Sequence, residues 1–222
     1  MKLLLIFLLM LVLPIAAQIG VSVAFNKYSK IDNSRGYTAA QVARQILDSN
    51  GLYNIRIEHI KGNLTDHFSP TEGVVRLSDS VYNSRSLAAI GVAAHECGHA
   101  CQHAEKYAPI QLRTAIVPVV NICSRYWYLV FFLGLAAFQS VKLAYIGIIM
   151  FLAVVIFQLV TLPTELNASR RALKTLEGQY ILEADEIPKA RKVLIAAAMT
   201  YVTALITSIL QLLSLILRVK KD

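Results

Sequence analysis

Four strongly apolar blocks alternate with polar segments along the chain. They cover residues 3–25, 126–138, 143–162 and 193–217, and Ala115 is the earliest start that the second block allows. The first block carries no charge and is long enough to cross the ~30 Å of hydrocarbon in a bilayer. It continues beyond Ala16-Ala17, a pair that resembles a signal-peptidase site, so we expect a retained anchor rather than a cleaved signal peptide. The pattern predicts four transmembrane helices.

These blocks divide the chain into six segments. Residues 1–25 form a transmembrane anchor, 26–113 a polar region, and 114–162 a transmembrane hairpin with its turn at Lys142. Residues 163–192 form a polar segment whose helix is expected to begin after Pro163, with Thr164 as its N-cap. A last transmembrane helix at 193–217 and a basic tail at 218–222 complete the chain. With four spans, the two polar segments lie on the same side of the membrane.

The polar region 26–113 mixes helical and strand patterns. Thr38 and Gln41 match a capping box, and the helix that follows is expected to end at Asn50-Gly51. Residues 53–60 alternate between apolar and polar side chains and predict a strand, and residues 74–78 predict a second one. The apolar, Ala-rich run 87–94 predicts another helix, with Asn83 or Ser84 as its N-cap. The region is therefore expected to be a small α+β domain.

The candidate chemistry lies on this second helix, where His95-Glu96-Cys97-Gly98-His99 forms an H-E-x-x-H pattern. Four residues correspond to about one helical turn, so the two imidazoles share a face and can bind one tetrahedral Zn²⁺. Zinc lowers the pKa of a bound water towards ~7, and Glu96 can take the proton of that water. The alternative is a chance match of two core histidines, but an uncompensated Glu96 would be costly to bury.

A catalytic zinc usually has three protein ligands and one open position. His103 lies on the same helical face as His95, but about 12 Å along the axis at 1.5 Å per residue, which is too far for one ion. His67 and His59, from the predicted strand region, are alternatives. Glu165 is preferred, because it comes directly after a span on the same side of the membrane as the motif. The predicted metal ligands are therefore His95, His99 and Glu165.

Composition and charge support a membrane protein. Hydrophobic residues make up 56% of the 222 residues, and the net charge is +8. No nucleic-acid motif or aromatic-interleaved basic patch occurs, so no nucleic-acid partner is expected. Segment 26–113 carries ten Lys and Arg and segment 163–192 carries six, whereas the segments expected on the other side of the membrane carry five. The positive-inside rule therefore predicts that segments 26–113 and 163–192 lie in the cytoplasm. The odd number of cysteines, Cys97, Cys101 and Cys123, argues against disulfides. Cys97 and Cys101, four residues apart on the motif helix, are expected to pack as small buried side chains.

Four stretches of the chain resemble the YugP-type neutral zinc metallopeptidases of bacterial membranes. They are DHF at 66–68, VVRLSDSVY at 74–82, GVAAHECGHACQH at 91–103 and LPTELNASRRAL at 162–173. The layout is more distantly similar to membrane gluzincins of the HtpX and CAAX-protease type, where a hairpin of spans separates H-E-x-x-H from a glutamate ligand in an E-x-x-A-D segment. Glu165 and Ala168 match that segment. Ser169 stands in place of the Asp, so Asn167 or another residue has to support the histidine.

Residues and resemblance together predict a mostly α membrane protein with about four transmembrane helices and a small α+β zincin-like catalytic domain carrying HExxH. The resemblance implies a multi-pass zinc endopeptidase of the bacterial cell membrane that cleaves proteins or peptides, including membrane or misfolded proteins. Val74–Ser78 offers an edge for an extended substrate, or is an ordinary core strand. His67, Tyr180 and Arg171 are the candidates for stabilising the oxyanion.

Two other functions compete with this interpretation. A site-2-type protease, which cuts inside the bilayer, would place the motif on a transmembrane helix, but charged and polar residues flank this helix closely (Ser84, Arg85, His103, Glu105 and Lys106). A non-catalytic membrane scaffold would bind metal only for stability, and such closed sites tend to have four protein ligands. The number of ligands therefore distinguishes the scaffold from the enzyme.

Overall fold

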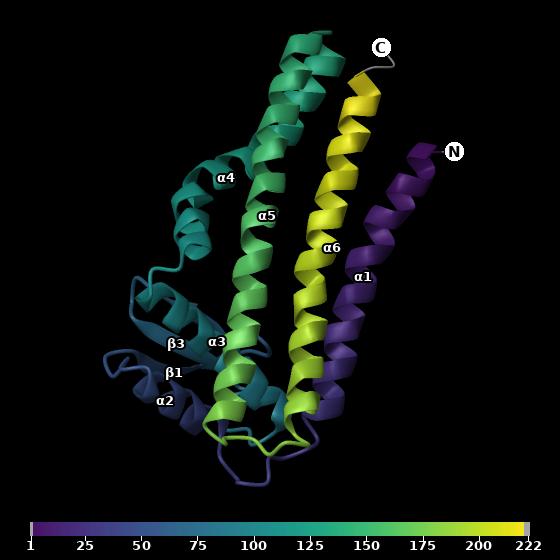
Figure 1. The fold of residues 1–222 in the computed structure, drawn as a ribbon. Coiled ribbons are helices and arrows are strands. Elements are labelled where there is room, and N and C mark those ends of the chain that lie inside the picture. Colours follow the sequence, from purple (N-terminus) through teal and green to yellow (C-terminus); the bar gives the residue numbers. More distant parts are fainter. Residues whose placement is uncertain (1, 220–222) are drawn as a thin grey trace. The chain divides into compact units, whose positions relative to one another are not determined.

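The computed structural model describes residues 2–219, so Lys220 and Lys221 of the predicted basic tail lie outside the described residues. The chain forms two compact units. We call them the sheet unit, which comprises Ile19–Tyr107 and Thr164–Ala198, and the long-helix unit, which comprises Ala108–Pro163 with the residues up to Gln18 and from Met199 on. Three long helices contribute residues to both units. They are α1 (Lys2–Tyr28), α5 (Val141–Gly178) and α6 (Ile187–Val219) (Figure 1).

The sheet unit contains a three-stranded sheet and two shorter helices, α2 (Ala39–Ser49) and α3 (Leu87–Ala104) (Figure 1). The strands are β1 (Arg56–Ile60), β2 (His67–Ser69) and β3 (Val74–Ser78), in the order β1-β3-β2. Strand β3 pairs in parallel with β1, Arg56 opposite Val74, and antiparallel with β2, Phe68 opposite Val75. The short strand β2 was not among the strands predicted from the sequence. Its position leaves β2 at one edge of the sheet.

Local sequence signals explain where the two short helices begin. Thr38 caps α2, and Gln41 completes the predicted capping box. Helix α3 begins later than predicted, because Ser86 rather than Asn83 or Ser84 is its N-cap and accepts a hydrogen bond from the backbone N–H of Ala89. The Ser84 hydroxyl instead donates to the Ser86 hydroxyl.

The core of the sheet unit lies between α2, α3, the sheet and the sheet-unit parts of α5 and α6. Val42, Ile46 and Leu47 of α2 pack there with Ile90 of α3 and Leu77 of β3, and all five are nearly or fully buried. Helix α3 is apolar on almost every side, which explains why an 18-residue helix with so many small residues is stable within this core. The core thereby fixes the helix that carries the motif.

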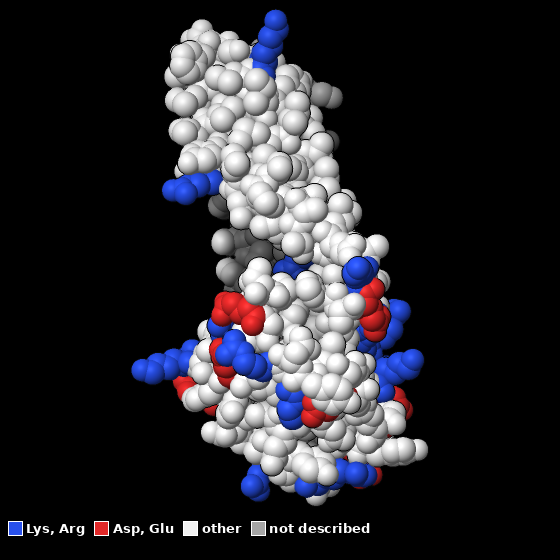
Figure 2. Space-filling view, turned by 90° about the vertical axis from the view of Figure 1, so that its left-hand side faces the viewer, with Lys and Arg blue, Asp and Glu red and all other residues white. Residues whose placement is uncertain are grey.

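The long-helix unit is formed by α4 (Ala108–Phe132), the π-helical turn η1 (Leu133–Ala137) and parts of α1, α5 and α6. Gly147 of α5 lies so close to Phe131 that an added Cβ would be 2.7 Å from its backbone nitrogen. Such close approach through small residues is typical of helices that pack within membranes. On the face drawn in Figure 2, charged side chains gather over the sheet unit, and the long-helix unit is almost uncharged.

Among the described residues, four helices are long and apolar enough to cross a membrane: Leu4–Tyr28, Ala108–Ala137, Val141–Gly178 and Ile187–Val219. Their number agrees with the prediction, but two boundaries differ. Helix α4 begins at Ala108, several residues before the predicted hairpin. Pro163 does not separate a span from a new helix, because α5 continues through it to Gly178. Glu165 therefore lies inside a continuous helix rather than near a helix start.

Candidate metal centre

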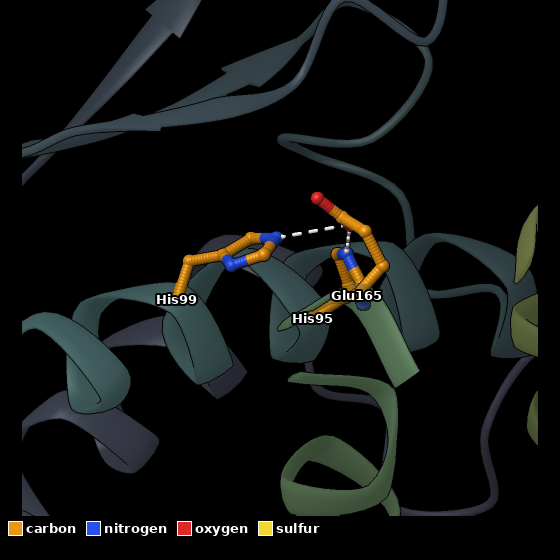
Figure 3. A group of neighbouring side chains, drawn as sticks. All are labelled: His95, His99 and Glu165. Atoms are coloured by element: carbon orange, nitrogen blue, oxygen red, sulfur yellow. Dashed lines mark hydrogen bonds and ion pairs between the residues drawn. The ribbon is translucent and has the colours of Figure 1, made fainter. Parts of the chain in front are cut away.

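The two motif histidines lie one turn apart on α3. Their rings are in edge-to-face contact, with centroids 4.7 Å apart. Both are partly buried, and Figure 3 shows them extending from the same side of the helix. The predicted juxtaposition of the two imidazoles is therefore present in the structure.

Glu165 comes from α5 and lies against both rings (Figure 3). Its Oε2 atom is 3.2 Å from Nε2 of His95 and 3.3 Å from Nε2 of His99. The carboxylate is buried, at 2% exposure, and the donor atoms of the three residues all lie within 4.8 Å of one another. Within residues 2–219 this is the one group of three such donors found together.

The spacing of the donors fits a tetrahedral zinc ion. Two ligands bonded at ~2.1 Å to a tetrahedral ion are ~3.4 Å apart, close to the two separations measured between Glu165 and the imidazoles. Two imidazole nitrogens and one carboxylate oxygen are also a ligand set used by catalytic zinc. The residues present therefore fit the metal that the sequence predicts.

A buried glutamine orients His99. The Nε2 amide of Gln102 donates to the backbone carbonyl of Thr164 at 2.8 Å and to Oδ1 of Asn167 at 2.9 Å. These two bonds turn Oε1 of Gln102 towards Nδ1 of His99, 3.0 Å away. Because an amide oxygen only accepts, Nδ1 has to carry the hydrogen, which leaves Nε2 of His99 as the available ligand atom.

Ser169 has the corresponding position beside His95. Its hydroxyl is 3.1 Å from Nδ1 of His95, so Nε2 again faces the Glu165 carboxylate. The sequence left open which residue replaces the Asp of the E-x-x-A-D segment and named Asn167 as one candidate. In the structure Asn167 contacts Gln102 and Arg171, and it is the serine itself that reaches the histidine.

Glu96 lies beside the edge strand β2. Its Oε2 atom accepts a hydrogen bond of 3.1 Å from the backbone N–H of Phe68. Of the two alternatives that the sequence left for Val74–Ser78, a substrate-pairing edge or an ordinary core strand, the structure agrees with the core strand, since β3 is the central strand of the sheet. The edge next to the motif helix belongs to His67–Ser69.

The other candidate residues from the sequence have different partners. His103 is exposed, with its ring 5.9 Å from that of Phe68. His59 pairs with Asp79 at 2.8 Å, and Nδ1 of His67 is 2.9 Å from the carbonyl of Thr65. Arg171 pairs with Glu105 at 2.7 Å, and Tyr180 is 72% exposed just after α5. None of the three histidines belongs to the cluster of donor atoms.

The electrostatic environment favours positive charge at His99. Burial lowers the pKa of His99, but the hydrogen bond that its ring donates to the Glu165 carboxylate and the charges of Glu96 and Glu165 outweigh this effect, so its pKa lies above the ordinary value. A site that stabilises a proton in this way also stabilises a metal cation. The nearby thiols differ, because burial raises the pKa of Cys97 and of Cys101 and keeps both neutral. Their packing role agrees with the sequence interpretation.

Sequence reasoning missed two contacts of the site, those of Gln102 and of the Phe68 backbone. A signal for Gln102 existed, because it follows His99 by three residues and therefore lies on the same helical face. No signal in the sequence indicates that the backbone N–H of Phe68 would contact Glu96.

Comparisons with known proteins indicate the family of the chain. A family model described as "Putative neutral zinc metallopeptidase" matches residues 3–220. The chain is 48% identical over 201 residues to the "Putative membrane protease YugP" of Bacillus subtilis (strain 168), a match that covers 90% of this chain and 89% of the relative. No solved structure shows a significant match to the chain.

Proposed function

Since the chain belongs to this family of neutral zinc metallopeptidases, we propose that it is a membrane-embedded zinc endopeptidase with its active centre at His95, Glu96, His99 and Glu165. The observation that carries the proposal is the contact of one buried carboxylate with both motif imidazoles, 3.2 and 3.3 Å away. Residues from two helices that are far apart in the sequence meet there at the separation expected of zinc ligands.

His95, His99 and Glu165 are the three residues that would hold the metal. When bound there, zinc would supply Lewis-acid polarisation of the scissile carbonyl and a lower pKa for a coordinated water. Gln102 and Ser169 keep the Nδ1 atoms engaged, so that each imidazole presents Nε2 to the metal.

Glu96 acts as the general base in this proposal. Its carboxylate takes a proton from the attacking water and then delivers it to the leaving amine. The backbone N–H of Phe68 holds one carboxylate oxygen of Glu96 at 3.1 Å. The carboxylate is thereby held between the motif helix and the edge strand, where we place the scissile peptide bond.

The edge strand β2 supports a polypeptide substrate. An extended peptide can pair with the free side of an edge strand through main-chain hydrogen bonds, which do not depend on sequence. Glu165 follows the apolar block 143–162 by three residues, about 5 Å along the helix, so the site lies near the membrane surface. We infer that proteins at or in the membrane, including misfolded ones, are the substrates, and that the site faces the cytoplasm.

Two features favour this function over its competitors. Helix α3 is not among the four candidate spans of residues 2–219, which disfavours a site-2-type protease that cuts inside the bilayer. The donor cluster of the described residues has three members, where a closed structural site would have four. The fourth position is therefore left for water or substrate.

The test separates zinc binding from catalysis. Glu96→Gln is expected to keep zinc and to lower hydrolysis of an unfolded protein such as casein by at least a hundredfold, because a general base contributes roughly 10²–10⁴ to the rate. Glu165→Ala is expected to lose zinc, measured by elemental analysis of the purified protein. His103→Ala, on the same helix but outside the cluster, is the control that keeps both properties.

Either of two results would contradict the proposal. If Glu96→Gln cleaves casein at the rate of the unchanged protein, Glu96 is not the base. If Glu165→Ala binds zinc as tightly as His103→Ala does, the carboxylate is not a ligand.

A further inference from the structure

A groove between α5 and α6 in the sheet unit has no role in the proposed chemistry. Its volume is about 450 Å³. Apolar side chains from both helices form its floor, and long basic side chains form its rim. The residues that carry the argument are Leu166, Leu194 and Ile195 on the floor and Arg170, Lys174 and Arg191 on the rim.

The three rim cations are not neutralised by the protein. All three side chains are exposed, and within residues 2–219 none takes part in an ion pair or a side-chain hydrogen bond. One carboxylate, that of Glu177, also lines the groove, which leaves an excess of two positive charges. The groove is therefore complementary to an anion.

The floor indicates what kind of anion fits. Leu166 and Ile195 are 43% and 54% exposed, so the apolar surface remains open beside the basic rim. Arg191 precedes the apolar block 193–217 of α6 by two residues, about 3 Å along the helix. Cations at the polar end of an apolar groove between spans match a molecule that has an anionic head and hydrocarbon chains.

We propose that this groove binds one anionic phospholipid, with its phosphate between Lys174 and Arg191 and its acyl chains along Leu166 and Ile195. Arg170 on α5 supplies the third cation. Long Lys and Arg side chains can place their charge at the level of the headgroups while their methylene stems cover apolar surface. The proposal is independent of the proposed function, because it rests on residues outside the donor cluster.

The experiment counts lipids that stay bound to the full-length protein. The protein is incorporated into nanodiscs that contain equal amounts of phosphatidylcholine, which has no net charge, and phosphatidylglycerol, which carries one negative charge. The lipids that remain bound to the protein are then identified by native mass spectrometry. One phosphatidylglycerol is expected to remain bound in preference to phosphatidylcholine. Lys174→Gln/Arg191→Gln, which removes one cation from each wall, should weaken phosphatidylglycerol binding by roughly tenfold to thirtyfold.

The matched control is Lys27→Gln/Lys192→Gln. It also removes two exposed cations close to apolar blocks, but neither residue lines the groove. The control is expected to keep the preference of the unchanged protein. Activity is not the readout, since Ser169 lines the groove and also contacts His95.

Three results would overturn the proposal. The first is equal retention of both lipids by the unchanged protein. The second is an equal loss of phosphatidylglycerol in the groove variant and in the control, which would indicate attraction by general surface charge. The third is displacement of the bound lipid by millimolar inorganic phosphate, which would show that the acyl chains contribute nothing and that the groove is a simple anion site.

Discussion

Gln102 is fully buried, and its amide determines which nitrogen of His99 is available to a metal. The same side chain donates to Thr164 and Asn167 on α5, one residue before and two residues after Glu165. One glutamine thus connects a proposed ligand on α3 with the helix turn that carries another. Partners of metal-binding histidines of this kind contribute strongly to affinity, because they fix the tautomer and the orientation of the ring.

Gln102→Leu should therefore weaken zinc binding although Gln102 is not itself a ligand. The leucine keeps the volume but removes the acceptor for Nδ1 of His99 and the two donors to α5. We expect a tenfold to hundredfold rise in the dissociation constant for zinc, measured by competition with a chromogenic chelator.

Gln179→Leu is the control, because the side chain of Gln179 donates to the exposed Ser49 hydroxyl and lies directly after the end of α5, about four turns of helix beyond Glu165. Its zinc affinity should match that of the unchanged protein. Equal affinities for all three proteins would mean that the orientation of His99 does not depend on Gln102.

At the scale of elements, the site depends on the close packing of α3 against α5. The two helices approach closely at Gly98, because a Cβ built there would be 2.7 Å from the carbonyl oxygen of Ala168 and 3.2 Å from its Cα. Both neighbours are backbone atoms, which cannot move aside by changing a rotamer. The absence of a side chain at Gly98 is what brings His95 and His99 within reach of Glu165.

Gly98→Ala is expected to force the two helices apart and to weaken zinc binding together with stability. Overpacking of this kind costs typically about 1–3 kcal/mol, more than the ~1 kcal/mol that alanine gains over glycine in a helix. Gly91→Ala on the same helix is the control, because its Cβ would meet nothing closer than 3.7 Å and should leave stability unchanged or raised. Thermal unfolding of the purified proteins and their zinc content give the comparison, and a Gly98→Ala protein as stable and as zinc-loaded as Gly91→Ala would refute the argument.

Elements that depend on local sequence patterns could be predicted from the sequence. The spacing of His95 and His99, the capping box at Thr38 and the apolar blocks are local patterns, and each predicted its element correctly. Pro163 misled the prediction of a helix boundary, because within a membrane helix the backbone groups that a proline leaves unpaired can be satisfied by the surroundings. Gly178, not Pro163, is the last residue of α5.

Contacts between distant segments could not be read from the sequence in the same way. Ser169 reaches His95 across 74 positions, and Gln102 reaches Thr164 across 62. Such contacts depend on the register in which α3 packs along α5, and the close approach at Gly98 helps to set this register. The sequence predicted that Glu165 would lie beside the two histidines, but it treated the glutamate as the start of a new helix, and its role as a ligand stays a prediction.

At the scale of the whole molecule, the two units differ in charge. The described residues of the long-helix unit include no Asp or Glu, and their five Lys and Arg are Lys2, Arg113, Arg125, Lys142 and Arg218. The sheet unit holds the remaining described cations and all described carboxylates, so its polar segments carry most of the positive charge. The positive-inside rule therefore predicts that the sheet unit lies on the cytoplasmic side of the membrane.

Cysteine labelling of cells tests this orientation together with the number of spans. Lys61→Cys lies in the exposed segment after β1, and Lys142→Cys lies in the first turn of α5, so each removes one lysine. Cys123 is first replaced by serine, while Cys97 and Cys101 are buried and stay. A maleimide that cannot cross membranes should label Lys142→Cys in intact cells and Lys61→Cys only after permeabilisation.

The reverse pattern would move the site to the outer face and keep the four spans. Labelling of both positions in intact cells would show that α4 does not cross the bilayer, because an uncrossed α4 leaves the two positions on one side.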